Sequence, residues 1–155
     1  MTFMTSDILI YNILKKSEDP FISKCNVKFI DKNVPAEEDE TIYVANIDLE
    51  TYQETYSGVE YKALVNIYVK TKDTNYVKGS RFLRTVVKHI KNVLREDDEC
   101  KVRNIRFRNI KYEYGSGYTL KGLHLIVQLL EHESYLEDDE FECIDKIELD
   151  EIELQ

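Results

Sequence analysis

The chain has 155 residues, of which 43% are hydrophobic and 33% are charged. This balance excludes a disordered chain and favours a single globular domain. The three cysteines, Cys25, Cys100 and Cys143, are far apart and form no CxxC pair, which argues against a zinc site and a disulfide framework. The N-terminal sequence lacks the positive start of a signal peptide, and no apolar run approaches the ~20 residues of a membrane span. We therefore expect a soluble protein made and kept in a reducing cytoplasm.

The net charge of −9 conceals an uneven distribution of charge along the chain. Residues 62–121 carry a net charge of +9, whereas residues 131–155 contain 12 acidic side chains and one lysine. A basic middle and an acidic end indicate a charged partner, or docking between complementary parts of the protein itself.

The first part of the chain predicts a helix and two short strands. The helix covers residues 6–16, with Thr5 or Ser6 as its N-terminal cap. Alternation of apolar and polar residues predicts strands over 25–29 and 42–47. The acidic segment between these strands is predicted to be a solvated loop.

Residues 48–59 predict a long hairpin connection rather than a tight turn. Gly58 is the expected position of a positive φ in this connection, because glycine has no Cβ to oppose it. Connections of this length in compact domains are often functional loops.

The clearest structural signal is a change of period between residues 60 and 94. Apolar residues alternate with others along 61–69, as in a strand with one buried face. After a polar link, apolar residues recur at helical spacing, at Leu83, Val86, Val87, Ile90, Val93 and Leu94. The acidic run 96–99 is predicted to end this helix unfavourably, since acidic side chains oppose the negative end of a helix dipole.

Two further strands are predicted over 102–114 and 118–131, joined by a short glycine turn at 115–117. The apolar residues change parity within the first of these strands, which predicts a bulge near 108–110.

From Ser134 onward the chain is acidic, with irregularly spaced apolar residues. It is either an arm that becomes ordered on a partner or a frayed terminal helix. The predicted fold class is therefore α+β, with an antiparallel or mixed sheet of about four to five strands packed against two main helices. The domain spans residues 1–133, and the acidic C-terminal arm spans 134–155.

The predicted long helix carries a basic stripe opposite its apolar side. Its five members lie within an arc of about 80° at 100° per residue, and they are Arg81, Arg84, Lys88, Lys91 and Arg95. The stripe is either an ordinary solvated helix face or a surface for an acidic protein or for nucleic-acid phosphates. The sequence contains no helix-turn-helix spacing, RNP-type aromatic motif or zinc finger that would indicate base recognition.

No constellation of catalytic or metal-binding residues occurs in the sequence. The histidines His89, His124 and His132 are isolated, and they form no HxxxH pair. Ser116 lies between two glycines but lacks the strand-to-helix context of a nucleophile elbow. We therefore expect no enzyme activity, no metal and no cofactor.

The order of predicted elements resembles that of the tail terminator, or tail completion, proteins of tailed phages and phage-tail-like particles. The resemblance rests on Tyr56-Ser57-Gly58, on the sequence VNIYVKTKD at Val65–Asp73, and on the helix start around Gly79. The hairpin ending at Glu131 completes it, so that it covers roughly residues 5–131. The acidic C-terminal arm departs from the compact pattern of that family.

Members of this family form a hexameric ring on top of the tail tube, so the resemblance implies the same here. Such a ring would stop tube polymerisation and offer a docking face to the head or neck connector protein. DNA would pass through its lumen without sequence readout. The protein would then belong to the tail or neck of a virion, assembled in the host cytoplasm.

Two alternatives remain open from the sequence: another neck or head-tail connector protein, and a nucleic-acid-binding or regulatory module with a basic surface. The residues expected at a subunit or partner interface come from the hairpin connection, the basic stripe and the arm. They are Tyr52, Tyr56, Gly58, Arg81, Arg84, Lys88, Lys91, Arg95, Phe141, Ile144, Ile147 and Leu149.

Overall fold

The computed structural model describes residues 5–30, 40–73, 75–114 and 120–135. In chain order the elements are α1 (Ser6–Lys15), the short 3-10 helix η1 (Ile22–Lys24), β1 (Asn26–Phe29), β2 (Thr41–Thr55), β3 (Gly58–Lys70), α2 (Tyr76–Glu96), α3 (Asp98–Val102), β4 (Arg106–Tyr114) and β5 (Leu120–Ser134). Within the described ranges, no helix is long and apolar enough to cross a membrane.

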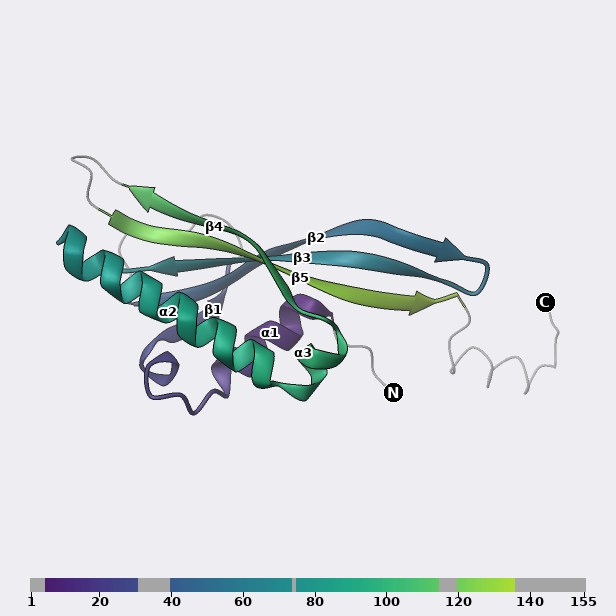
Figure 1. Ribbon diagram of the computed structural model, residues 1–155, viewed down its shortest axis with the longest axis horizontal. Coiled ribbons are helices and arrows are strands. Elements are labelled where there is room, and N and C mark those ends of the chain that lie inside the picture. Colours follow the sequence, from purple (N-terminus) through teal and green to yellow (C-terminus); the bar gives the residue numbers. More distant parts are fainter. Residues whose placement is uncertain (1–4, 31–39, 74, 115–119, 136–155) are drawn as a thin grey trace. The chain divides into compact units, whose positions relative to one another are not determined.

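The five strands form one mixed sheet in the order β1-β2-β3-β5-β4 (Figure 1). β1 pairs in parallel with β2, and β4 pairs antiparallel with β5. The arrows of β2, β3 and β5 alternate in direction across the middle of the sheet. Strands β1 and β4 are therefore the two edges, and the predicted α+β class is confirmed.

The chain divides into two compact units. The larger unit contains the described parts of Met1–Glu50 and Lys62–Glu131, and the smaller contains those of Thr51–Tyr61 and His132–Gln155. All the helices that the structure describes and the main hydrophobic core belong to the larger unit, while the smaller holds the ends of β2 and β5 and the start of β3.

The core of the larger unit forms where α1 and α2 cover one face of the sheet (Figure 1). Its buried members come from alternate strand positions and from one side of each helix. They include Leu9, Ile10 and Leu14 of α1, Val65, Ile67 and Val69 of β3, Leu83, Val86, Ile90 and Leu94 of α2, and Leu123, Leu125, Val127 and Leu129 of β5. Each such side chain contributes about 1.5–3 kcal/mol through burial. The predicted strand parity and helix register are thus confirmed.

The predicted long connection over 48–59 is wrong, because β2 and β3 continue almost to their turn. β2 ends at Thr55 and β3 begins at Gly58, which leaves a two-residue turn. Thr55 Oγ1 donates a hydrogen bond to the Gly58 carbonyl at 3.2 Å across this turn. The end of β2 is exposed on both faces, so its residues show no apolar alternation by which a strand is recognised.

Gly58 is needed for space and not for a positive φ, which corrects the sequence prediction. Its φ lies outside the left-handed region, but a Cβ added to it would lie 2.7 Å from the carbonyl oxygen of Glu133. A side chain at this position would collide with the backbone of β5.

α2 ends at Glu96 within the acidic run 96–99, as predicted, but the remainder of the run begins a second helix. Asp97 Oδ1 accepts hydrogen bonds from the N–H groups of Glu99 at 3.0 Å and Cys100 at 3.3 Å. The first two residues of α3 are acidic and lie at its positive end, where they are favourable. The predicted strand start at 102 is wrong for the same reason, since α3 occupies that position.

The predicted bulge in β4 is confirmed. The pairing register with β5 shifts between Phe107 and Asn109, which leaves Arg108 as the extra residue. The predicted turn at 115–117, the predicted loop over 31–40 apart from Glu40, and the arm beyond residue 135 lie outside the described residues.

We predict that Asn75→Ala lowers the free energy of unfolding by about 1 kcal/mol. Asn75 Oδ1 accepts a hydrogen bond from the Lys78 N–H at 3.0 Å, and this bond caps the N-terminus of α2. Chemical denaturation of the wild-type and variant proteins measures the difference. Asn75→Asp retains the acceptor and is the matched control, so equal losses in both variants would contradict the capping role.

Candidate functional site

The basic stripe of α2 lies on the exposed side of the helix. The apolar residues of α2 are buried against the sheet, so the opposite side faces outward. Four members of the stripe are exposed and Lys91 is half-buried. Within the described part of the chain, no carboxylate lies at ion-pair distance from any of the five.

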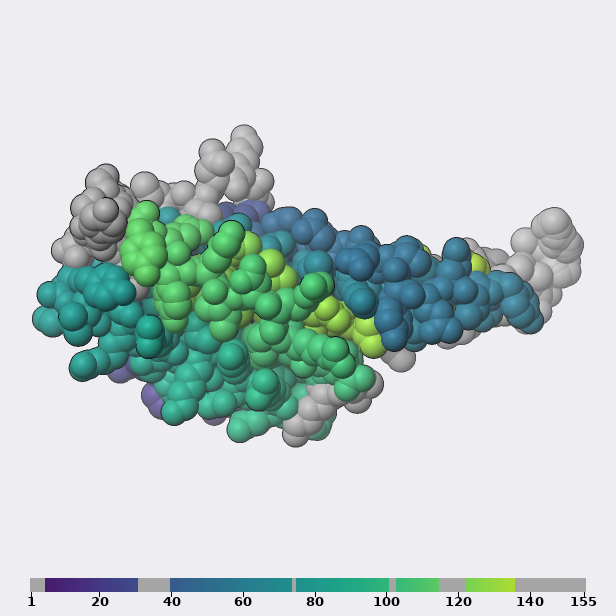
Figure 2. Space-filling model, turned by 45° about the horizontal axis from the view of Figure 1, so that its top comes forward, coloured from purple at the N-terminus to yellow at the C-terminus, as the bar shows by residue number. Residues whose placement is uncertain are grey.

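Aromatic rings of β4 hold three of these basic side chains. Lys91 Nζ lies 5.3 Å and Arg95 Cζ lies 5.6 Å from the ring centre of Phe107. Arg84 Cζ lies 5.9 Å from the ring centre of Tyr112. Cation–π contacts at exposed sites contribute about 0.5–1 kcal/mol each. These contacts restrict the movement of the three basic side chains. Figure 2 shows α2 and β4 together on one face.

Two shallow grooves flank the basic stripe. One has a volume of about 340 Å³ and is lined by Arg84, Val87, Lys88, Lys91, Asn92, Arg95 and Tyr112. The other has a volume of about 520 Å³ and is lined by Tyr76, Val77, Ser80, Arg81, Arg84, Thr85 and Lys88. Both grooves combine cations with apolar surface.

Exposed apolar side chains gather at the N-terminal end of α2. Tyr76, Val77 and Tyr114 are each half or more exposed, and the rings of Tyr76 and Tyr114 stack at 6.3 Å. We call the basic stripe together with Tyr76, Val77, Phe107, Tyr112 and Tyr114 the α2–β4 surface. Sequence reasoning found the stripe from its helical spacing but missed the aromatic residues, because they lie on another element.

The exposed edge of β4 is itself basic. Arg106, Arg108 and Lys111 are exposed on this edge strand, and Arg108 forms its bulge. Basic side chains and a bulge are devices that prevent an edge from pairing indiscriminately with other strands. In the register with β5, Arg106 pairs with Gln128 and Lys111 pairs with His124, so both lie on the sheet face opposite Phe107 and Tyr112.

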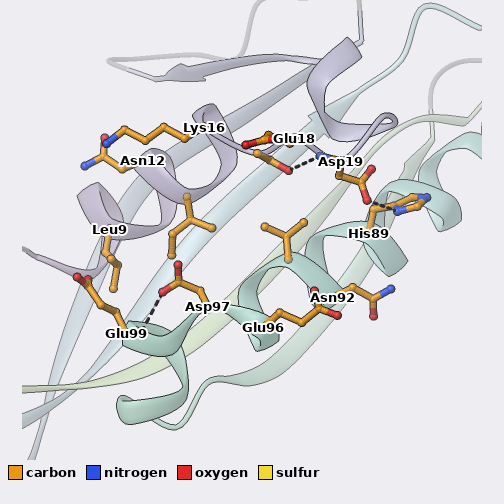
Figure 3. Close-up of a pocket in the computed structure, with 13 residues that line it drawn as sticks. Leu9, Asn12, Lys16, Glu18, Asp19, His89, Asn92, Glu96, Asp97 and Glu99 are labelled. Carbon is orange, nitrogen blue, oxygen red and sulfur yellow. Dashed lines mark hydrogen bonds and ion pairs between the residues drawn. The ribbon is translucent and has the colours of Figure 1, made fainter.

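A second concave site lies between α1 and the C-terminal half of α2 (Figure 3). It has a volume of about 780 Å³, and its lining includes the acidic residues Glu18, Asp19, Glu96, Asp97 and Glu99. Asp19 Oδ2 lies 3.0 Å from His89 Nδ1, and the His89 ring stacks on Phe21. The sequence separation of Asp19 and His89 hid this pair from sequence analysis.

Two of these acidic side chains, Asp19 and Asp97, accept hydrogen bonds from backbone N–H groups. Asp19 Oδ1 accepts hydrogen bonds from the N–H groups of Phe21 and Ile22, and Asp97 caps α3. Burial raises the pKa of Asp19, but these backbone hydrogen bonds and the adjacent His89 outweigh it and lower the pKa below its ordinary value. Among the described residues, no group of three or more His, Cys, Asp or Glu side chains is arranged to hold a metal ion.

A polar cluster occupies the sheet face opposite the helices. His124 Nε2 lies 2.7 Å from Asn66 Oδ1, and Asn66 Nδ2 donates to the Asn46 carbonyl at 3.3 Å. Because the Asn66 amide is oriented by Asn46, His124 Nε2 is the donor in the first bond. The His124 ring also stacks on Tyr68 at 4.4 Å.

The smaller unit presents the hairpin turn between β2 and β3. Tyr56 is 99% exposed on this turn, and Tyr52 is 54% exposed. Tyr135 donates a hydrogen bond to Glu54, and this bond raises the pKa of Tyr135 to about 12. Gly58 lies against the backbone of β5 and has no side chain to offer a partner. The predicted interface residues Phe141, Ile144, Ile147 and Leu149 lie outside the described residues.

We predict that the protein loses stability as the pH falls below about 6.5, in part through His124. Burial lowers the pKa of His124 below its ordinary value of 6.5, with Lys111 lowering it further and Glu113 opposing. The unfolded state therefore binds a proton at a pH where the folded state does not, and acid favours unfolding.

Chemical denaturation at about pH 7.5 and about pH 5.5 measures this loss. His124→Gln retains an amide donor but cannot titrate, so its loss of stability should be smaller. His132→Gln, at an exposed position, is the matched control. An identical pH dependence in wild-type and His124→Gln proteins would refute the assignment.

No protein-family model matches this chain, and no curated protein matches its sequence. The fold is nonetheless similar to that of a chain in the solved structure of the virion of a native gene transfer agent particle, with a TM-score of 0.54 and 8% sequence identity. The similarity covers 80% of this chain and 92% of that chain. This chain therefore shares its fold with nearly the whole of a protein chain found in a virion.

Proposed function

We propose that this protein is a structural component of a tailed phage or phage-tail-like particle. In this proposal it forms a ring that caps the tail tube, ends tube polymerisation and docks the head or neck. The observation that carries the proposal is the fold shared with a chain of a gene transfer agent virion, over 92% of that chain. The order of elements that resembles tail terminator proteins supports the finer assignment.

The surfaces of the chain are consistent with repeated contacts between copies. Tyr56 is an almost fully exposed aromatic side chain, and tyrosine is enriched at protein interfaces. The α2–β4 surface is basic, and no carboxylate of the described residues lies at ion-pair distance from its basic stripe, whereas the chain as a whole has a net charge of −9. Heterologous contacts that close on themselves produce cyclic rings, for which six subunits are proposed.

A role without catalysis is part of the same proposal. Asp19 and His89 form a carboxylate–histidine pair, which is a combination that catalytic sites use. The hydroxyl of the nearby Ser17, however, accepts a hydrogen bond from the Asp19 N–H and is not positioned by this pair as a nucleophile. Asp19 itself holds the backbone of η1. The pair is therefore assigned a structural role.

A second candidate function is binding to nucleic acid through the basic stripe. Five cations on one helix face favour it, since phosphate contacts depend on such charge and no described carboxylate lies at ion-pair distance from them. The two functions predict different complexes. The first predicts a ring that caps the tail tube, and the second predicts a complex with DNA whose affinity falls steeply as the salt concentration rises. Another connector role in the neck would give a ring that binds the head side but not the tube.

We predict that the purified protein caps tail tubes assembled from the tube protein of the same particle. Added during tube assembly, it should stop elongation, and electron microscopy should show one ring-shaped cap at tube ends. Native mass measurement of the capped end should give a closed ring, with six copies expected. A protein that stays monomeric and leaves tube length unchanged would refute the proposal.

The variant Tyr56→Ser should weaken capping by about tenfold and leave thermal stability unchanged, because the ring of Tyr56 makes almost no contact within the subunit. Ile8→Ser removes an exposed apolar side chain from α1 and is the matched control. Equal capping by the Tyr56→Ser variant and wild type would exclude the hairpin turn from the interface.

A further inference from the structure

We propose that the α2–β4 surface of one copy receives the acidic C-terminal segment, residues 136–155, of a second copy. The inference rests on the proposed self-assembly and names the contact that would join neighbouring subunits. It follows from the charge and shape of the α2–β4 surface and from the composition of the segment.

The described residues leave the charges of the basic stripe without an acidic partner. Its members are spaced three or four residues apart on α2, at Arg81, Arg84, Lys88, Lys91 and Arg95. Like charges at this spacing repel one another on a helix, and the described residues provide them with no carboxylate. The repulsion is relieved when an acidic partner covers the stripe.

The grooves determine which kind of acidic partner fits. Arg84 and Lys88 line both grooves, so the grooves adjoin each other along α2. Val87 and Tyr112 provide apolar surface in one groove, and Tyr76 and Val77 do so in the other. A partner that carries only charge would leave this apolar surface exposed, whereas a partner with interleaved acidic and apolar residues would cover both.

Residues 136–155 have this composition. They contain ten acidic residues and one lysine, interleaved with Phe141, Ile144, Ile147, Leu149, Ile152 and Leu154. The stripe from Arg81 to Arg95 extends about 21 Å at 1.5 Å per residue. An extended segment covers this length with about seven residues, so the segment is more than long enough.

The apolar residues of the segment provide the larger part of the binding, and its charges select the surface. Exposed ion pairs are individually weak and are screened by salt. Raising the salt concentration should therefore weaken the contact only in part. Each copy carries both the surface and the segment, so that the contact can repeat from copy to copy and close a ring.

The test uses two full-length variants with opposite defects. The surface variant carries Arg81→Glu and Lys88→Glu, which are exposed positions outside the contacts with Phe107 and Tyr112. The segment variant carries Glu148→Lys, Asp150→Lys, Glu151→Lys and Glu153→Lys. Each variant alone should self-associate about tenfold more weakly than wild type in analytical ultracentrifugation.

Mixing the two variants should restore association, because the acidic segment of one meets the basic surface of the other. A segment that folds back on its own chain predicts no gain on mixing, and that result would overturn the proposal. The proposal would also be overturned if the surface variant associated as strongly as wild type. It would equally be overturned if the stripe bound duplex DNA while neither variant changed association.

The exposed pair Lys15→Glu and Lys24→Glu is the control, since it makes the same charge change on other elements and should leave association unchanged. Thermal melts of all variants verify that they are folded. If wild-type protein still caps tail tubes while mixing restores nothing, this inference fails and the proposed function stands. If no form of the protein assembles or caps tubes, the proposed function fails.

Discussion

The packing of α2 against the sheet is the contact on which the rest of the structure depends. Its apolar side is buried with residues of β3 and β5, so its basic side has to face outward. The same placement brings the basic side chains over the aromatic rings of β4 and forms the acidic pocket against α1. The core and the main surface chemistry therefore arise from one helix whose two sides have different compositions.

Sequence periodicity predicted the fold wherever one face of an element is buried. The alternation over 61–69 and the helical spacing from Leu83 to Leu94 both describe buried stripes, and both were predicted correctly. The end of β2 shows no such periodicity, because both of its faces are exposed and no apolar alternation is required there. The acidic run 96–99 does contain the predicted end of α2 at Glu96, but the sequence did not predict that Asp98 and Glu99 begin α3.

The candidate surface was predictable only in part. The basic stripe was predicted from the helical spacing of its residues, because all of them lie on one element. Phe107 and Tyr112, which hold three of its side chains, belong to β4 and are brought there by tertiary folding. The pairs Asp19–His89 and Asn66–His124 were missed for the same reason, because no local pattern relates residues so distant in sequence.

Electron cryomicroscopy of intact particles that contain this protein tests the central proposal most directly. The proposal predicts a closed ring of identical copies at the head-proximal end of the tail tube, with density from an adjacent copy on the α2–β4 surface. Copies distributed along the tube wall, or a single copy without cyclic symmetry, would contradict it.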